Sequence, residues 1–192
     1  MKRIRRKFPR LRKSVTDVTK TGELKAVSQK TNQFPPKVEV FAFNSLEVVT
    51  KTDVTISEIS ELRDRFPLTW LNIDGLADEA LVRSVGELFN LHKLALEDVI
   101  NGHQRAKIED YGEYLFLVTT MLHICDEGLE TEQCSMFLGK NYVITFQEKP
   151  GDALHPVRER IRLNRGKIRS AGADYLGYSL LDAMIDAYFP VL

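Results

Sequence analysis

The stretch Leu91-His-Lys-Leu-Ala-Leu-Glu-Asp-Val-Ile-Asn-Gly-His-Gln-Arg-Ala-Lys-Ile-Glu-Asp-Tyr-Gly-Glu-Tyr114 is where the hydrophobic pattern of the chain changes its period. Before Gly102, apolar residues recur at helical spacing, which predicts a helix over about 94–101. After Gly102 they alternate with polar residues, which is typical of strands. The stretch also carries the adjacent acids Glu97 and Asp98 and no recognisable catalytic signature. The role of these two acids therefore decides the function.

The segments before this stretch predict a mixture of strands and helices. Asp78 is a good N-cap for a helix that runs through Phe89, and Ser57 for a shorter helix that ends near Arg65. Three strands are predicted in the same region: Lys37–Phe43, its hairpin partner Leu46–Thr50, and the buried Leu68–Ile73. The residues before Lys37 lack periodicity and end in Phe34-Pro-Pro36, so we interpret 1–36 as an arm and linker.

The segments after it predict a sheet followed by helices. The expected strands are Ala106–Tyr111, Tyr114–Cys125, Glu130–Leu138 and Tyr142–Gln147, joined by short turns. A helix follows from Pro156 to about Asn164, and a last helix begins near Ala173 and is still running at Leu192. This order predicts an α+β or mixed α/β sandwich, with a folded body over 37–172 and the start of a further helix over 173–192.

The charge is unevenly distributed, although the 27 basic and 27 acidic residues give a formal net charge of zero. The first 13 residues hold eight Lys or Arg and no acid, so 19 basic and 27 acidic residues remain in the rest of the chain. An acidic body favours cations over nucleic acid as partners. The basic arm fits a solvated tail, contact with anionic lipid headgroups, or nucleic-acid binding, and the sequence leaves these open.

Several classes of protein are disfavoured by simple features. Two cysteines, Cys125 and Cys134, are too few for a disulfide framework or a zinc site, and they indicate a reducing compartment. No apolar run approaches the roughly 18–20 residues that a membrane-spanning helix needs. The four histidines match no metal-binding spacing, and there is no phosphate loop or nucleophile elbow.

Two groups of acids are candidates for cation binding. Glu97 and Asp98 are neighbours on a helix, so their side chains diverge by about 100° and cannot close on one ion by themselves. They could supply oxygens to a hard divalent cation whose other ligands come from elsewhere. Asp182 and Asp186, four residues apart on the last helix, repel each other unless a positive group lies nearby. For both pairs, a solvated helix face is the simpler interpretation.

Three further features have competing interpretations. A metal-dependent hydrolase that uses Glu97, Asp98 and His103 is conceivable, provided that the three groups converge within one chain. Lys107, with Arg105, lies among many local acids, which favours structural ion pairs over phosphate binding. The four arginines between Arg158 and Arg165 favour a solvated basic helix, with an acidic partner or headgroup as the alternative.

The chain resembles the N-terminal cytoplasmic domain of the CorA family of magnesium and cobalt channels. The resemblance is carried, in order, by Trp70-Leu-Asn-Ile-Asp-Gly75, Leu91-His-Lys-Leu-Ala-Leu-Glu-Asp-Val-Ile100, His103-Gln-Arg-Ala-Lys107, Phe146-Gln-Glu-Lys149, Pro156-Val-Arg-Glu-Arg-Ile-Arg162 and Asp174-Tyr175 through Tyr188-Phe-Pro190. It implies a mixed α/β/α sandwich with a largely antiparallel sheet, in a homopentamer whose last helix leads toward a stalk and a transmembrane region. Those parts are missing here, so the resemblance implies a cytoplasmic fragment of an inner-membrane protein that is not an enzyme.

The resemblance also implies a regulatory role for the acids. By motif position, Glu97, Asp98 and Asp182 fall on the acids with which the family senses cytosolic Mg²⁺ between subunits, so weak regulatory Mg²⁺ binding is expected, with Co²⁺ as a further cation. The chain departs from the pattern at Lys93 and Ala106, where the family often has proline, and Lys93 adds a positive charge near the site. A related zinc-transporting branch shares the architecture and is the alternative within this resemblance.

Overall fold

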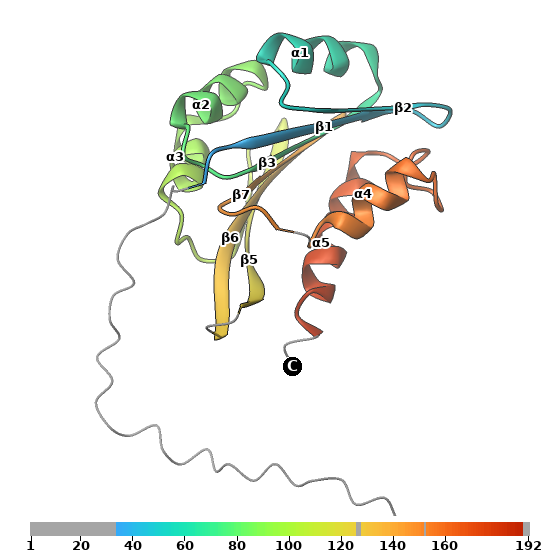
Figure 1. Cartoon of the computed structure of the whole chain (residues 1–192). Helices are drawn as coiled ribbons and strands as arrows, with labels where there is room; N and C mark the ends of the chain where they lie inside the picture. Colours follow the sequence, from blue (N-terminus) through green and yellow to red (C-terminus); the bar gives the residue numbers. More distant parts are fainter. Residues whose placement is uncertain (1–33, 126–127, 152, 190–192) are drawn as a thin grey trace, which may run out of the picture. The chain divides into compact units, whose positions relative to one another are not determined.

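A computed structural model of the chain describes residues 34–125, 128–151 and 153–189, without the side chains of 122–130. It contains a seven-stranded sheet in the order β2-β1-β3-β7-β6-β5-β4 (Figure 1). The strands are β1 (Lys37–Phe43), β2 (Val48–Thr52), β3 (Leu68–Asp74), β4 (Lys107–Asp110), β5 (Tyr114–Cys125), β6 (Gly128–Gly139) and β7 (Tyr142–Gln147). All neighbouring strands are antiparallel except β3 and β7, which are parallel.

Helices cover both faces of the sheet. On one face lie α1 (Ile56–Arg65), α2 (Glu79–Leu88) and α3 (Lys93–Asn101), and on the other lie α4 (His155–Arg162) and α5 (Ala173–Asp186) (Figure 1). Because side chains alternate along a strand, each central strand contributes to two separate cores. In β3, Leu71 and Ile73 pack under α1–α3, whereas Trp70 packs under α4 and α5. The predicted α/β/α sandwich is confirmed.

The predicted elements are all found, and their ends differ for local reasons. The first helix begins after Thr55 rather than Ser57, because Thr55 and Glu58 form a reciprocal capping box. The hairpin partner begins at Val48 rather than Leu46, because the side chain of Asn44 accepts hydrogen bonds from the Leu46 and Glu47 amides and holds the turn.

The last helix differs most from its prediction. It was expected to continue to Leu192, but α5 ends at Asp186. The sequence offers a reason, since Pro190 has no N–H to donate to the carbonyl of Asp186 and restricts the residue before it. Residues 190–192 lie outside the described residues, as does nearly all of the predicted arm 1–36. Within the described part, α5 belongs to the core of the sandwich, where Leu176, Leu180 and Met184 are buried.

Candidate cation site on α3

The α3 helix and the turn after it hold the candidate acids in a fixed position. His92 is the N-cap, and its Nδ1 accepts a hydrogen bond from the Leu94 amide at 3.2 Å. The helix ends at Asn101, and the next two residues, Gly102 and His103, turn the chain away from it with φ angles of 61° and 56°. Positive φ suits glycine best, so the Gly-His pair forces the change from helix to strand that the sequence predicted.

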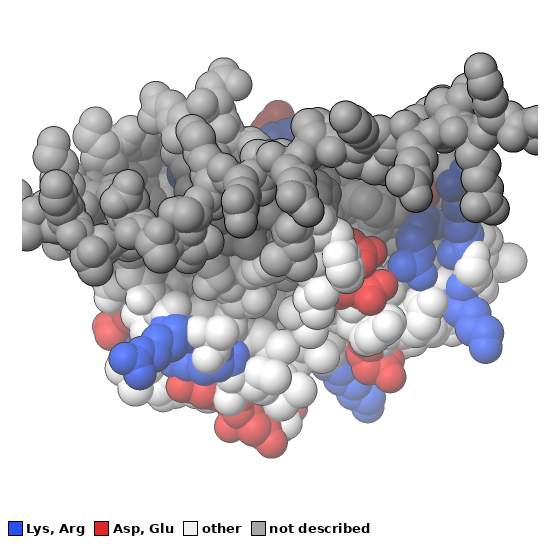
Figure 2. Space-filling model, turned by 90° about the horizontal axis from the view of Figure 1, so that it is seen from below, with Lys and Arg blue, Asp and Glu red and all other residues white. Residues whose placement is uncertain are grey.

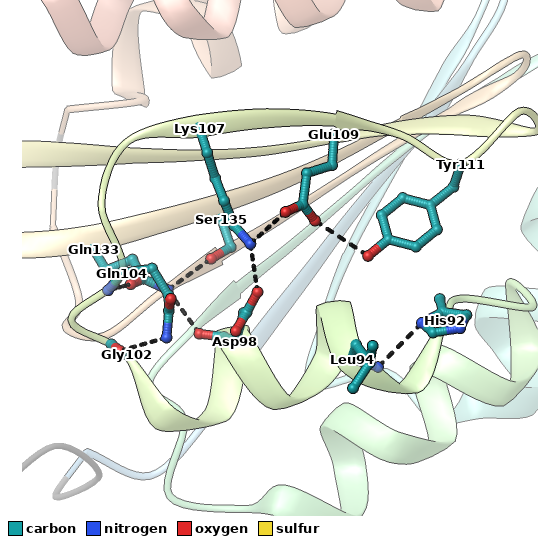
Figure 3. Close-up of polar contacts among 10 residues, drawn as sticks. All are labelled: His92, Leu94, Asp98, Gly102, Gln104, Lys107, Glu109, Tyr111, Gln133 and Ser135. Carbon is teal, nitrogen blue, oxygen red and sulfur yellow. Dashed lines mark hydrogen bonds and ion pairs between the residues drawn. The ribbon is translucent and has the colours of Figure 1, made fainter.

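Asp98 is one member of an ion-paired cluster (Figure 3). The Nζ of Lys107 on β4 lies 2.6 Å from Asp98 and 2.7 Å from Glu109. Its hydrogen bonds to Asp98 and then to Glu109 raise the pKa of Lys107 above its usual range. The hydrogen bond from Lys107 also lowers the pKa of Glu109. The structural ion pair expected for Lys107 is therefore present, and its amine already holds the carboxylate proposed to bind a cation.

Gln133 fixes the end of α3 against the sheet, which sequence reasoning missed. Its side-chain nitrogen donates to the backbone carbonyl of Asp98 and to Ser135 Oγ, both at 3.0 Å (Figure 3). Its side-chain oxygen accepts a hydrogen bond from the backbone N–H of Gln104 at 2.7 Å. A buried amide with its donor and acceptor both used is a rigid connection. It positions the backbone that carries Asp98 relative to β6. The alternating pattern of a strand shows which residues face the same side, but it does not indicate that Gln133 bonds to a distant helix.

Glu97 and Asp182 are separate from this cluster. Glu97 is exposed on α3, next to Asp98 but pointing in a different direction, as expected for adjacent helical residues. Asp182 is exposed on α5, and so is Asp186 one turn later. Because α3 and α5 pack on opposite faces of the sheet, one chain does not bring Asp182 to Glu97 and Asp98.

The donor chemistry suits a hard divalent cation, but a single chain supplies few donors. Carboxylate oxygens are the ligands that Mg²⁺ prefers, together with water. Among the described side chains, no group of three or more His, Cys, Asp or Glu residues is placed to hold a metal ion. The hydrolase alternative needs Glu97, Asp98 and His103 to converge, and this finding gives it no support.

A second charged cluster lies on the other face of the sheet and corrects one interpretation of the sequence. Arg158 was expected on a solvated basic helix, but it is buried. Its Nε lies 3.0 Å from Glu39 Oε2, and its Nη2 lies 3.7 Å from Asp74 Oδ2. Asp74 also accepts hydrogen bonds from Asn72 and Gln147. Burial raises the pKa of Asp74 despite the opposing effects of Asn72 and Arg158.

The described surface that is visible in Figure 2 carries charges of both signs. There, Lys and Arg side chains alternate with Asp and Glu side chains in small groups on the described part of the surface.

None of the helices in the described ranges combines the length and the apolar character that a membrane span requires.

Comparison with known proteins places the chain in a family. The family model described as CorA-like Mg²⁺ transporter protein matches residues 67–192. The cobalt/magnesium transport protein CorA of Thermotoga maritima is 45% identical over 159 residues, which cover 81% of this chain and 45% of that protein. The chain thus spans less than half the length of this relative.

Solved structures share the fold at low identity. The soluble domain of CorA from Methanocaldococcus jannaschii superposes with a TM-score of 0.61 at 11% identity, covering 80% of this chain and 58% of that one. The cytoplasmic domain of ZntB from Vibrio parahaemolyticus gives a TM-score of 0.57 at 11% identity, covering 82% and 62%. At such identity these structures support the fold alone, whereas the family model and the Thermotoga relative decide the membership: this chain belongs to the CorA-like Mg²⁺ transporter protein family.

Proposed function

We propose that this chain is the cytoplasmic regulatory domain of a CorA-type channel for Mg²⁺, and also Co²⁺, in the inner membrane. In this proposal Glu97, Asp98 and Asp182 sense cytosolic Mg²⁺ between the subunits of a homopentamer. Membership of the family supports the transport role, and the relative in Thermotoga is named for cobalt and magnesium. The chain itself contributes the sensing part, and its partners are copies of itself and the transmembrane region of the same protein.

The position of the acids is the observation that carries the sensing proposal. Glu97 is exposed on α3, Asp98 is partly buried beside Lys107 of β4, and Asp182 is exposed on the opposite side of the sheet. Acids placed in this way can share a cation only when different copies of the chain supply them. Facing carboxylates repel each other across such a boundary, which favours separation of the subunits.

A bound divalent cation would neutralise those carboxylates and favour the assembled, closed state, since a ligand shifts an equilibrium toward the state it binds more tightly. The residues around the acids would set how far a given Mg²⁺ concentration shifts this equilibrium. Gln133 keeps the end of α3 fixed, so the backbone of Asp98 is already in place before a cation binds.

Lys107 adds a regulating element to the proposed site. Its amine lies 2.6 Å from Asp98, so it acts as a built-in competitor for a cation. A cation must displace this amine or share the carboxylate with it. The competition would keep the affinity for Mg²⁺ weak, which suits a sensor that must release its ligand when the cytosolic concentration falls. Replacing Lys107 with Met is therefore expected to tighten Mg²⁺ binding at Asp98.

The test is a Mg²⁺ titration followed by NMR chemical shifts, on this chain and on a longer pentameric chain. Shifts near Glu97 and Asp98 are expected in both, and shifts near Asp182 only in the pentamer. Glu97→Gln with Asp98→Asn should remove them, whereas Glu87→Gln, at an exposed position on α2, should not. No response at any of the three acids in the pentamer would falsify the sensing role while leaving the family membership intact.

The zinc-transporting alternative is distinguished by the same titration. The ZntB domain shares the fold at 11% identity, which carries no conclusion about the ion. Zinc sites favour His and Cys ligands, whereas the acids proposed here offer only oxygen. Competition between Zn²⁺ and Mg²⁺ on the pentameric chain decides between them, because zinc that displaced Mg²⁺ at equal concentration would favour the alternative.

A further inference from the structure

A polar hollow lies beside the buried Arg158 cluster. It has a volume of about 320 Å³ and opens between α4 and the adjoining ends of β1 and β3. Glu39, Asp74 and Arg158 line it, together with Lys37, His155 and Arg162. Lys37 and Asp74 are opposite each other in the pairing of β1 with β3, so the hollow lies at that end of the sheet.

The topology of the sheet favours ligand binding at this end. The parallel strands β3 and β7 end side by side, with Asp74 paired to Gln147. After β3 the chain continues to α2 on one face, and after β7 it continues to α4 on the other (Figure 1). Ligands of open α/β sheets bind outside the carboxyl ends of parallel strands at such a switch of direction. The hollow is lined by the last residue of β3 and by Pro150 and Gly151, which follow β7.

The charges in the hollow favour an anion. His155, Arg158 and Arg162 are spaced i, i+3 and i+7, so they share the face of α4 that lines it. Lys37 adds a further cation at the start of β1. The N-terminus of α4 has no side-chain cap and no acid in its first turn, which leaves its partial positive charge uncompensated. Among the lining residues, three permanent cations face the two carboxylates of Glu39 and Asp74, and Arg162 also pairs with Glu159 outside the lining at 3.2 Å.

Arg158 provides an independent observation. Its side chain is 6% exposed, yet Nε and Nη2 make no hydrogen bond of regular geometry with any described residue, although two carboxylates lie nearby. Buried donors in native proteins nearly always have an acceptor. The planar guanidinium matches the oxygens of a phosphate or carboxylate group.

We propose that this hollow binds a small oxyanion of the phosphate class, held by Arg158 at its base and by Arg162 and Lys37 at its mouth. The acceptor oxygens of the ligand would complete the hydrogen bonding of Arg158. The site is distinct from the acids proposed to sense Mg²⁺, since it lies on the α4 face of the sheet. It therefore does not depend on the function proposed above.

Inorganic phosphate is the probe, titrated into the 192-residue chain at constant ionic strength and followed by NMR or calorimetry. Arg162→Gln and Lys37→Gln are suitable variants, because both side chains are solvent-accessible and neither belongs to the core. Each should weaken phosphate binding by roughly two- to fivefold, the range expected for losing one partly exposed ion pair. Arg165→Gln is the matched control, because it removes the same charge from an exposed residue outside the hollow.

A second arm separates a free anion from a lipid headgroup. The chain is mixed with vesicles of phosphatidylcholine, with and without phosphatidic acid. Binding of free phosphate that Arg162→Gln weakens identifies a soluble ligand, whereas binding of phosphatidic acid alone with the same sensitivity identifies a headgroup. Equal weakening of binding in Arg165→Gln overturns the proposal, because the response would then reflect the overall charge of the chain. The absence of binding to both phosphate and phosphatidic acid overturns it as well.

Discussion

The two faces of the sheet each carry one cation held between two carboxylates, and the clusters differ in burial. On the α4 face, the side chains of Arg158, Glu39 and Asp74 are 4–8% exposed. On the α3 face, those of Lys107, Asp98 and Glu109 are 26–40% exposed. Burial removes the screening by water, so it raises both the attraction within a cluster and the cost of breaking it. The first cluster is thus suited to hold the fold and the second to exchange partners.

The side-chain types agree with this difference. Arginine keeps its charge because its planar group resists loss of the proton, which suits a buried position between two carboxylates. The compact amine of lysine on a flexible stem moves readily between water and an acid. A cation in solution can therefore compete with Lys107 for Asp98 far more easily than with Arg158 for Asp74.

The largest expected effect comes from removing the buried cation. Arg158→Met leaves Glu39 and Asp74 without a counter-charge in the interior, and such losses typically cost about 3–5 kcal/mol. Urea unfolding measures the change in the free energy of unfolding. Arg165→Met, at an exposed position, should change it by less than about 0.5 kcal/mol.

A triple variant checks the cause of that loss. Adding Glu39→Gln and Asp74→Asn to Arg158→Met removes the uncompensated charges, so a large part of the stability should return. If Arg158→Met alone cost less than about 1 kcal/mol, water would have to reach the cluster, and the contrast in burial between the two faces would be wrong.

The next effect is a difference in pH dependence between the clusters. The pKa of Asp74 is raised in the folded protein, so its contribution to stability grows as the pH falls through that pKa toward about 4, its value in the unfolded chain. The pKa of Glu109 is lowered, so its contribution is full above about 4.3 and is lost as the pH falls further. Asp74→Asn and Glu109→Gln should therefore change the slope of stability against pH in opposite directions between pH 3 and 7.

The measurement is urea unfolding at several pH values for both variants and the parent chain. Glu113→Gln is the control, since this exposed acid follows β4 without belonging to either cluster. Slopes that change in the same direction in both variants would contradict the opposed pKa shifts.

Most of the fold could be predicted because its signals are local. The period-two pattern predicted Tyr114–Cys125 and Tyr142–Gln147 with the ends that the structure has. The Gly102-His103 turn and the capping role of Asp78 also depend on neighbouring residues. The start of α1 was missed because Thr55 and Ser57 are both good caps, and only the reciprocal bond with Glu58 favours Thr55.

The buried cluster could not be predicted for the opposite reason. Arg158 lies in a run of arginines that is typical of a solvated helix, and its partners are on β1 and β3, far away in the sequence. Pairing across a sheet depends on the register of strands, which composition does not reveal. The ion pair of Lys107 was expected because acids surround it locally. The sensing role of Glu97, Asp98 and Asp182 stays a prediction.

A smaller effect is expected from the exposed cluster. Lys107→Met removes the amine between Asp98 and Glu109, but partly exposed ion pairs contribute only about 0–1 kcal/mol to stability. The change in unfolding free energy should therefore be several times smaller than that of Arg158→Met. If Lys107→Met lowered the free energy of unfolding as much as Arg158→Met does, the two clusters would contribute equally to stability, and the contrast between them would be wrong.

The smallest effect on this chain is expected at Asp182, which is exposed on α5 and has no place in either cluster. Asp182→Asn should change the free energy of unfolding by less than about 0.5 kcal/mol. In the longer, pentameric chain proposed above, the same variant should weaken the response to Mg²⁺, which analytical ultracentrifugation of the assembly with and without the ion would measure. Asp186→Asn, one turn further along the same helix, is the matched control, because it removes an equal charge from a neighbouring exposed position. An equal loss in both variants would assign the effect to the general charge of α5 rather than to Asp182, and would leave Asp98 and its competitor Lys107 as the part of the proposed sensor that still stands.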